Sequence, residues 1–194
     1  MPGQFYIGGG IGSGKSTAVS HFASLGAVVV SGDDAGRRVL APGTAETALV
    51  HDRWPEAVGS GGVLDRKALG RIVFADPAQL LELEVITAPG IRRIVLEAVD
   101  ASAGETVLVE VPVLHDLAGR EWPWIVVDAP EATRIERAVA RGSGTTAAYV
   151  RMVMDRQPSR GEWLAAARWV VDNSGDDDAL ALQCRRIWDK ITSV

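Results

Sequence analysis

Short apolar runs alternate with amphipathic segments along most of the chain. Runs rich in valine, isoleucine and aromatic residues predict buried β-strands at 5–7, 27–30, 106–111, 124–127 and 169–171. Apolar residues at helical spacing predict helices at 16–25, 65–74, 77–86, from 130 onward, from a capping box at 159–162 and at 177–191. Strands that alternate with helices form a parallel sheet with both faces covered. The pattern therefore predicts an α/β fold, with a five-stranded parallel sheet flanked by helices.

The stretch between the second and third predicted strands, residues 42–103, has helical patterns and no convincing strand. A connection of this length inside one sheet is typical of a helical subdomain. In nucleotide-binding α/β proteins, such a subdomain stands over the carboxyl ends of the strands, where ligands bind. We expect a single domain whose core is formed by residues 1–41 and 104–194, with a helical subdomain at about 42–103 that holds a second substrate. A purely structural elaboration is the alternative.

Composition narrows the class of protein. Hydrophobic residues make up 47% of the 194 residues, which argues against disorder, yet no run of about 18 apolar residues is available to span a bilayer. The formal net charge of −5 disfavours a broad nucleic-acid surface. The start of the chain has no secretory leader, and the single Cys184 is expected to be buried in the last helix, with a catalytic thiol as the alternative. We expect a cytoplasmic protein that binds neither membrane nor nucleic acid.

Residues 9–16 read Gly-Gly-Ile-Gly-Ser-Gly-Lys-Ser, a complete phosphate-loop motif between a predicted strand and a predicted helix. The glycines let the backbone aim several N–H groups at a β-phosphate, and the helix N-terminus adds positive potential. Lys15 is placed to reach the β- and γ-phosphates, and the Ser16 hydroxyl to ligate Mg²⁺. A glycine-rich turn that binds nothing is the alternative. The motif predicts ATP and Mg²⁺, with the nucleotide held by Gly9, Gly10, Ile11, Gly12, Ser13, Gly14, Lys15, Ser16 and Thr17.

Carboxylates follow two of the predicted strands. Asp33 follows the second strand, where it can orient an acceptor hydroxyl for attack on a γ-phosphate; a helix cap is the alternative. Arg37 lies one helical turn later and is a candidate to contact a substrate phosphate, or else to form a surface pair with Asp33. Glu110 ends the third strand. It is a candidate to bind Mg²⁺ through water, with a strand-end carboxylate paired to a basic neighbour as the alternative.

Arginines recur at helical spacing around a glycine-rich loop at 141–146. Arg141 adjoins the glycines and is the candidate lid residue that reaches the γ-phosphoryl group as charge develops there. A solvated helix face is expected for most of the others, which are Arg134, Arg137, Arg151 and Arg156. Asn173 follows the last strand and is a candidate border of the adenine, with a simple strand-to-helix turn as the alternative.

Taken in order, these residues resemble those of the dephospho-CoA kinase family. Beyond the phosphate loop, the similarity rests on 33–43 (Asp-Asp-Ala-Gly-Arg-Arg-Val-Leu-Ala-Pro-Gly), 64–74 (Leu-Asp-Arg-Lys-Ala-Leu-Gly-Arg-Ile-Val-Phe), 86–92 (Ile-Thr-Ala-Pro-Gly-Ile-Arg), 111–114 (Val-Pro-Val-Leu), Gln157 and 171–175 (Val-Asp-Asn-Ser-Gly). The likeness covers nearly the whole chain. A phosphate loop alone indicates only nucleoside triphosphate binding, whereas this ordered set is far more specific.

The resemblance implies a phosphate-loop kinase fold of the nucleoside monophosphate kinase type, with a core, a helical substrate-binding subdomain and a lid at about 141–157. It implies transfer of the ATP γ-phosphoryl group to the ribose 3′-hydroxyl of dephospho-CoA, the last step of coenzyme A synthesis, in a monomer or small homo-oligomer. Asp33 would be the general base, Lys15 and Arg141 would stabilise phosphoryl charge, and Ser16 would hold Mg²⁺. The acceptor would be bound by Asp33, Arg37, Pro89, Arg92, Pro112, Leu114 and Gln157.

The chain departs from the family pattern near the presumed cleft. The departures are Gly8 for threonine, Ser31 for aspartate, Ala88 for a histidine associated with the acceptor site, Glu110 for aspartate and His115-Asp116 for Phe-Glu. The motifs expected to bind the nucleotide are intact, so the two alternatives to the function implied by the resemblance concern the acceptor. One is a divergent kinase that acts on another small metabolite hydroxyl, and the other is an ATP-binding regulatory switch with little transfer activity. Retention of Asp33, Arg37 and Gln157 favours catalysis.

Overall fold

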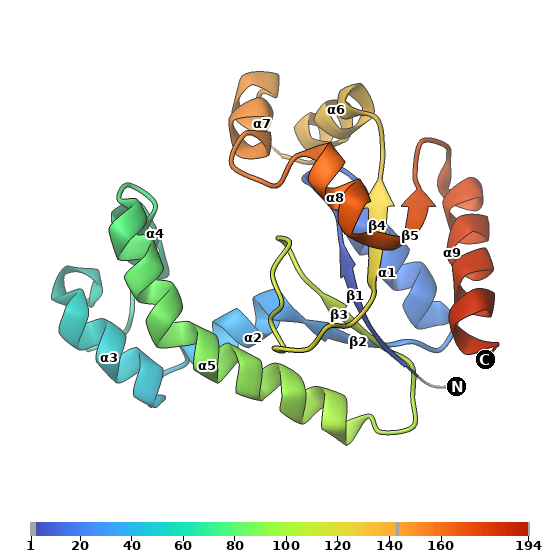
Figure 1. The fold of residues 1–194 in the computed structure, drawn as a ribbon. Helices are drawn as coiled ribbons and strands as arrows, with labels where there is room; N and C mark the ends of the chain where they lie inside the picture. Colours follow the sequence, from blue (N-terminus) through green and yellow to red (C-terminus); the bar gives the residue numbers. More distant parts are fainter. Residues whose placement is uncertain (1–2, 143, 194) are drawn as a thin grey trace. The chain divides into compact units, whose positions relative to one another are not determined.

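The computed structural model describes residues 3–142 and 144–193. Within these residues, five strands form one all-parallel sheet in the order β2-β3-β1-β4-β5 (Figure 1). Their bounds are β1 Gln4–Gly8, β2 Val28–Ser31, β3 Val107–Glu110, β4 Trp124–Asp128 and β5 Ala167–Asp172. Each strand lies where an apolar run predicts it. The predicted α/β fold with a five-stranded parallel sheet is confirmed.

Helices follow β1, β2, β4 and β5, whereas a loop joins β3 to β4. The helices are α1 Lys15–Ser24, α2 Gly32–Val39, α3 Ala45–Arg53, α4 Arg66–Val73, α5 Pro77–Ala101, α6 Glu131–Arg141, α7 Ala147–Met154, α8 Arg160–Ala166 and α9 Asp177–Thr192, with a 3₁₀ turn at Pro55–Ala57. Helix α8 begins with the predicted capping box, in which Ser159 accepts from the Glu162 N–H and Glu162 accepts from the Ser159 N–H. In the described part of the chain, no helix is long and apolar enough to cross a membrane.

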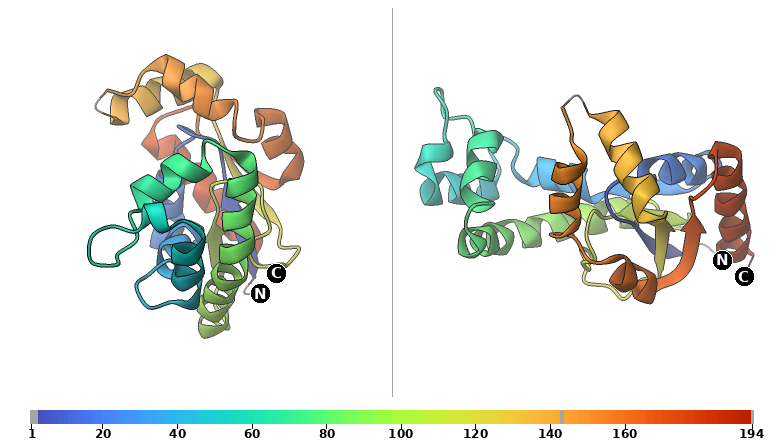
Figure 2. Two further views of the ribbon diagram at one scale, coloured as in Figure 1. Left: turned by 90° about the vertical axis from the view of Figure 1, so that its left-hand side faces the viewer. Right: turned by 90° about the horizontal axis from the view of Figure 1, so that it is seen from above.

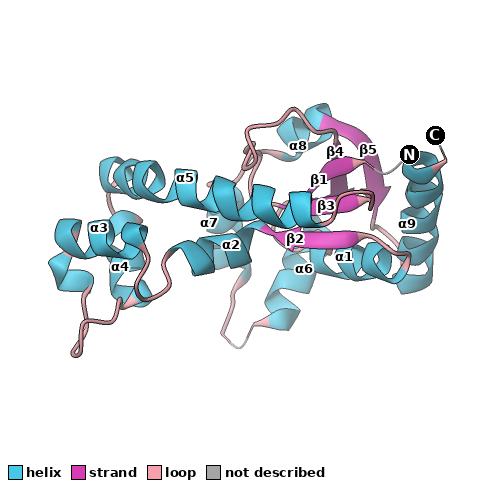
Figure 3. Cartoon of the chain, turned by 90° about the horizontal axis from the view of Figure 1, so that it is seen from below, coloured by secondary structure: helices cyan, strands magenta, loops and turns pink. Residues whose placement is uncertain are grey.

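Helix α5 differs from its prediction, because it continues past residue 86 to Ala101 and contains Pro89 (Figure 3). A proline removes one backbone hydrogen bond and usually breaks a helix. Here the second half of the helix buries Ile94, Val95 and Val99 along one face, at the i, i+1 and i+5 positions of a helical stripe. Burial of this stripe offsets the lost hydrogen bond, which the local pattern up to residue 86 does not reveal.

The chain divides into two compact units. The first contains the residues up to Ser31, Val99–Asp116 and the residues from Arg120 onward, and therefore the sheet with α1 and α6 to α9. The second contains Gly32–Ala98 and Leu117–Gly119, and therefore α2, α3, α4 and most of α5. The phosphate loop belongs to the first unit, and the region around Asp33 to the second.

The core of the first unit lies between the sheet and the helices α1 and α9. Alternate residues of the strands face these helices, as the period of two in a strand requires. The buried set includes Phe5, Ile7, Leu108, Ile125, Val127 and Val171 from the strands, Ala18 and Phe22 from α1, and Leu180, Cys184, Ile187 and Ile191 from α9. Cys184 is fully buried, and this burial raises the pKa of its thiol to about 12, so it is a core residue and no thiolate nucleophile.

Aromatic side chains cover part of the other face of the sheet. Tyr6 of β1 stacks on Trp124 of β4, with ring centroids 4.8 Å apart, and Trp163 of α8 meets Trp124 edge-on at 5.9 Å. Gly8, at the end of β1, lies under this pair. A Cβ atom at Gly8 would come within 2.9 Å of the Trp124 ring and closer still to Trp163. The glycine at this position is therefore matched to the two tryptophans.

The second unit has its own core, in which α3, α4 and the first half of α5 pack together (Figure 2). Trp54 follows α3, is completely buried, and donates its indole N–H to the Gln79 side-chain oxygen at 2.8 Å. Val50, Leu69 and Val73 complete the buried centre. A helical unit with a separate core follows the second strand.

Candidate functional site

The phosphate loop connects β1 to α1 at the carboxyl edge of the sheet. Gly12 and Gly14 have φ values of 76° and 88°, in the left-handed region that side chains other than glycine rarely adopt. Gly14 is also the N-cap of α1, and it provides no side-chain cap. The first N–H groups of α1 are therefore left for an anion, at the end of the helix where the potential is positive.

Lys15 and Glu110 form an ion pair across two neighbouring strands of the first unit. The Lys15 ammonium group donates to the Glu110 carboxylate, and the side chains are only 17% and 19% exposed. Glu110 ends β3, whose register pairs it with Ile7 of β1, so the carboxylate lies beside the start of the loop. This contact is the one that the alternative interpretation of Glu110, a strand-end carboxylate with a basic partner, predicts. A role of Glu110 toward a metal remains a prediction.

Both backbone polar groups of Ile11 are held by side chains that come much later in the chain. Its N–H donates to the Gln157 side-chain oxygen at 2.8 Å. Its carbonyl accepts from Arg134 Nε at 3.0 Å. Gln157 follows α7 and Arg134 belongs to α6, so the structure places Gln157 against the phosphate loop.

Asn173 supports the loop from the α9 side. Its buried amide donates to the Ser13 carbonyl at 2.8 Å, and its own carbonyl accepts from Arg137 at 2.8 Å. Arg137 also donates to the Gly175 carbonyl at 3.1 Å. The turn after β5 is thus bound both to the loop and to α6. Asn173 also lines a neighbouring cavity, so its predicted place at the border of a nucleoside stays open.

Two cavities adjoin the loop. One, of about 230 Å³, is lined by residues 9–16 together with Pro112, Arg141 and Gln157. The other, of about 180 Å³, is lined by Gly14, Thr17, Arg137, Arg141, Asn173, Gly175, Asp176, Asp177 and Leu180. Gly14 and Arg141 line both. The first cavity is bordered by loop N–H groups and two cations, which suits a polyphosphate, and the second leads from it toward α9.

The oxygen donors near the loop suit a small divalent cation. Ser16 is the second residue of α1 and is exposed, and Glu110 supplies a carboxylate. Mg²⁺ prefers such oxygen ligands and keeps several waters, so it needs few protein groups. In agreement with this, the described residues contain no group of three or more His, Cys, Asp or Glu side chains that could hold a metal by themselves. The residues present therefore fit Mg²⁺ bound partly by phosphate oxygens.

The segment after β3 carries Pro112 and Leu114. Pro112 lines the phosphate-loop cavity, and Leu114 is half-buried. Asp116, one of the departures from the family pattern, accepts hydrogen bonds from the Tyr6 hydroxyl and from the Arg120 N–H. This carboxylate therefore anchors the segment to β1.

The remaining predicted residues belong to the second unit. Asp33 is exposed in the first turn of α2, two residues after β2 ends, and it is not a cap residue preceding the helix. Arg37 approaches Asp34 at 3.6 Å, so the predicted surface pair forms with Asp34. Ala88, Pro89 and Arg92 occupy α5 and are exposed.

Arg134 and Arg137 are corrections to the sequence analysis, which expects most arginines of this region on a solvated helix face. Arg134 is only 7% exposed and Arg137 is half-buried, and both donate to backbone carbonyls of the loop or of the turn after β5. The sequence signal available for Arg134 and Arg137 was their helical spacing relative to Arg141, the predicted lid residue. Nothing in one helix pattern distinguishes an arginine that faces solvent from one that faces a loop 120 residues earlier. Arg151 and Arg156 are exposed as expected.

Known sequences are similar to this chain over nearly all of its length. Residues 5–178 match the family model described as dephospho-CoA kinase. A dephospho-CoA kinase of Xanthomonas campestris pv. campestris is 38% identical over 191 residues, which cover 95% of this chain and 92% of that protein. One of Thermobifida fusca is 36% identical over 187 residues, which cover 94% of this chain and 93% of that protein.

Solved structures show the same fold. A Thermus thermophilus protein superposes with a TM-score of 0.86 at 33% identity, covering 98% of both chains. The dephospho-CoA kinase of Campylobacter jejuni superposes with a TM-score of 0.74 at 23% identity, covering 100% of this chain and 98% of that one. A shikimate kinase of Acinetobacter baumannii gives 0.52 at 13% identity, covering 100% and 94%. The last two likenesses concern the fold alone.

Proposed function

This chain belongs to the dephospho-CoA kinase family, and we propose that it transfers the γ-phosphoryl group of ATP to the ribose 3′-hydroxyl of dephospho-CoA to give coenzyme A. The observation that carries the proposal is the complete phosphate loop, whose cavity is shared by Lys15 and Arg141 and adjoins a second cavity at Asn173. Such an arrangement suits a polyphosphate in the first cavity and the nucleoside in the second.

The main chemical contribution of Lys15 and Arg141 is positive charge at the loop. In phosphoryl transfer, charge develops on the oxygens of the transferred group, and fixed cations lower its energy. Lys15 would exchange Glu110 for the β- and γ-phosphates when ATP binds, because Lys15 already lines that cavity. Arg141, at the end of α6 and lining both cavities, would stabilise the γ-phosphoryl charge.

The proposal includes Mg²⁺, which neutralises phosphate charge when bound. Ser16 would be its direct protein ligand, and Glu110 would bind it through water after releasing Lys15. The exchange keeps the Glu110 carboxylate compensated in both states, as a poorly exposed charge requires.

On the acceptor side, Asp33 would accept the proton of the ribose hydroxyl. Its position two residues after β2 supports this role, since the strand ends at the same edge of the sheet as β1 and β3. Arg37, Pro89, Arg92, Pro112 and Leu114 would bind dephospho-CoA. Gln157 would act at the boundary of the two substrates, because it lines the phosphate-loop cavity. The lid at about 141–157, the substrate role of the helical subdomain, a cytoplasmic location and a monomer or small oligomer all belong to the same proposal.

A coupled assay of ADP release tests this function. The protein with ATP and Mg²⁺ should release ADP only when dephospho-CoA is added, and the product should carry a 3′-phosphate by mass spectrometry and NMR. Ala88, where the family has histidine, makes a different acceptor the second candidate. ADP release with another hydroxyl metabolite, and none with dephospho-CoA, would support that candidate. ATP binding without release for any acceptor would support a regulatory switch.

A further inference from the structure

Arg134 has no assigned role in the reaction, although it is the most deeply buried arginine near the phosphate loop. Its side chain is 7% exposed, and Nε donates to the Ile11 carbonyl at 3.0 Å. Among residues 3–142 and 144–193 it has no ion pair with a carboxylate. The neighbouring Asp128 is occupied by Arg160, whose guanidinium donates to both of its oxygens at 2.6 to 3.1 Å. Arg134 is therefore a buried cation that binds a peptide oxygen directly and is within electrostatic reach of Asp128 and Glu131 without pairing with either.

The loop is built to accept this side chain. A Cβ atom at Gly10 would collide with the Arg134 guanidinium group, and one at Gly12 would collide with the Arg134 main-chain carbonyl. Two glycines of the motif are thus matched to one residue of α6, in addition to their conformational role. The close approach places a positive charge directly against the backbone of the loop.

Arg134 lies behind the loop, outside the phosphate cavity. It lines a separate cavity of about 540 Å³ together with Arg151, Gln157 and Arg160, and it is not among the residues that line the phosphate-loop cavity. Direct contact with ATP is therefore not its role. Gln157 lines both cavities and accepts a hydrogen bond from the N–H of the same residue, Ile11.

We propose that Arg134 is a positioning residue for ATP, which together with Gln157 clamps the backbone of Ile11 and keeps the phosphate loop in its nucleotide-binding shape. The clamp fixes the N–H and the carbonyl of one residue, and so two consecutive peptide units at the tip of the loop, which keeps the flanking N–H groups aimed at the cavity. The guanidinium charge behind the backbone adds to the potential that attracts phosphate. The inference rests on the proposed function only in taking ATP as the ligand.

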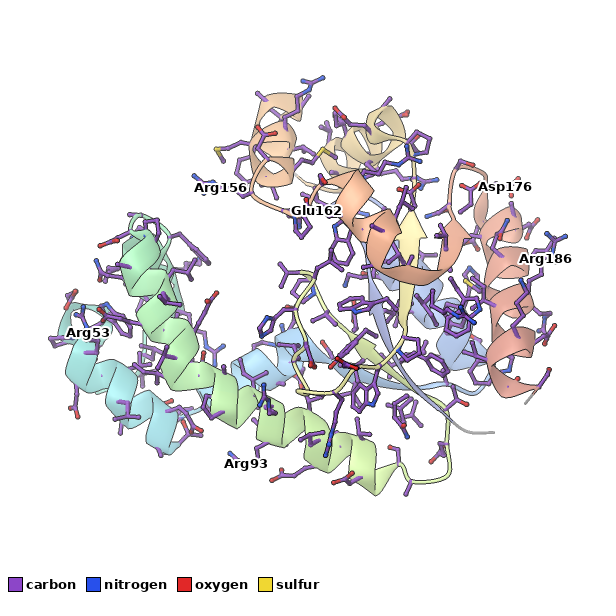
Figure 4. All side chains as sticks on the ribbon, in the orientation of Figure 1. Arg53, Arg93, Arg156, Glu162, Asp176 and Arg186 are labelled. Carbon is purple, nitrogen blue, oxygen red and sulfur yellow. The ribbon has the colours of Figure 1, made fainter. Side chains whose placement is uncertain are left out.

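The first experiment measures ATP affinity by calorimetry in the absence of dephospho-CoA. Arg134→Met keeps most of the side-chain volume but removes the charge and the hydrogen bond, and it should weaken ATP binding about tenfold. Arg134→Lys restores the charge and should recover part of the loss. The matched control is Arg186→Met, because Arg186 lies exposed on α9, away from the loop (Figure 4). Unchanged ATP affinity in a folded Arg134→Met protein would overturn the proposal.

The second experiment is a double-mutant cycle on the same binding constant. Gln157→Met removes the other half of the clamp, and independent effects of about tenfold each would multiply to about 100-fold in the double variant. If the two contacts act as one clamp, the loss of either contact already frees the backbone of Ile11. We therefore expect the double variant to bind ATP about as weakly as the single variant with the lower ATP affinity. Full multiplication would show that the residues act separately and would overturn the clamp. If Arg134→Met fails to fold, Gln157→Met still tests the clamp. Gln157→Met alone should weaken ATP binding, and wild-type ATP affinity in Gln157→Met would reject the proposal.

A steady-state measurement separates this inference from the proposed function. Arg134→Met should raise the KM for ATP while leaving the KM for dephospho-CoA nearly unchanged, and a general loss of structure would alter both. If wild-type protein binds ATP but does not phosphorylate dephospho-CoA, the proposed function fails, and the calorimetric test of the clamp still stands. Equal changes in both KM values would argue against a positioning role toward ATP.

Discussion

Lys15 of the phosphate loop donates a hydrogen bond to Glu110, which ends the neighbouring strand β3. Both side chains are less than one-fifth exposed, so each charge depends on the other for compensation. Nucleotide binding must replace this partner for Lys15, and a new cation must replace Lys15 for Glu110. The pair therefore connects the first step of ATP binding with the uptake of Mg²⁺ in the proposed reaction.

Lys15→Ala should lower dephospho-CoA-dependent ADP release by about 10²-fold or more, because no neighbouring cation can occupy its place at the β- and γ-phosphates. The variant leaves Glu110 without its partner, so the double variant Lys15→Ala/Glu110→Gln is the control for folding. Turnover is measured by the coupled assay, and folding by circular dichroism. Undiminished phosphoryl transfer in either folded variant would contradict the role of Lys15.

Asp33→Asn should lower kcat by about 10²-fold and leave ATP affinity unchanged, because it removes the base but keeps the shape of the side chain. Asp34→Asn is the matched control, since Asp34 is the next residue of the same exposed turn and pairs with Arg37 at 3.6 Å. Single-turnover kinetics at saturating ATP measure the chemical step. Equal effects of the two substitutions would mean that the turn, and not one carboxylate, matters.

Ala88→His should improve the use of dephospho-CoA, through a lower KM or a higher kcat. A new imidazole would add one hydrogen bond to the acceptor, worth about 1 to 3 kcal/mol if it is charge-assisted. The site tolerates the substitution, because Ala88 is exposed on α5. Ala88→Gln, which is similar in size but has no imidazole, is the control. No gain from histidine would indicate that this chain binds its acceptor without that position.

The buried thiol of Cys184 should lower the free energy of unfolding at high pH. Burial, with a smaller effect of Asp177, raises the pKa of its thiol from 9.0 to about 12 in the folded protein. Between these values the unfolded chain binds fewer protons than the folded one, so the free energy of unfolding falls as pH rises, by at most about 1.4 kcal/mol per pH unit from this group.

Urea denaturation of the wild type and of Cys184→Ala, at about pH 8 and about pH 10.5, isolates this contribution. Other groups also titrate in this range, but they are common to both proteins. The wild type should lose more stability than the variant over the interval. Equal losses would show that the thiol is not held protonated by the fold.

Trp54→Ala should lower the stability of the helical unit by about 3–5 kcal/mol, because a fully buried ring leaves a large cavity between α3, α4 and α5. Trp54→Phe should cost less, although it leaves the Gln79 oxygen without its indole donor at 2.8 Å. Thermal unfolding followed by circular dichroism gives the order of the three proteins. A variant as stable as the wild type would contradict this account of the core.

The sequence by itself determined the five strands, the phosphate loop and most helix positions, because these depend on local periodicity and on glycine spacing. The buried runs at 106–111 and 124–127 are recognisable without their neighbours, since a strand covered on both faces is apolar throughout. The capping box at Ser159 is likewise a property of four consecutive residues. The family resemblance rests on ordered motifs, so it is also a property of the sequence alone.

Only the tertiary structure decided what each charged residue of the site contacts. Lys15 and Glu110 are 95 residues apart, and Arg134 and Ile11 are 123 apart, so no local pattern relates them. The extension of α5 through Pro89 likewise depends on the burial of Ile94, Val95 and Val99 in its second half. Periodicity shows which residues lie on one face of a helix, but not what that face meets, because the partner is selected by the packing of the whole unit.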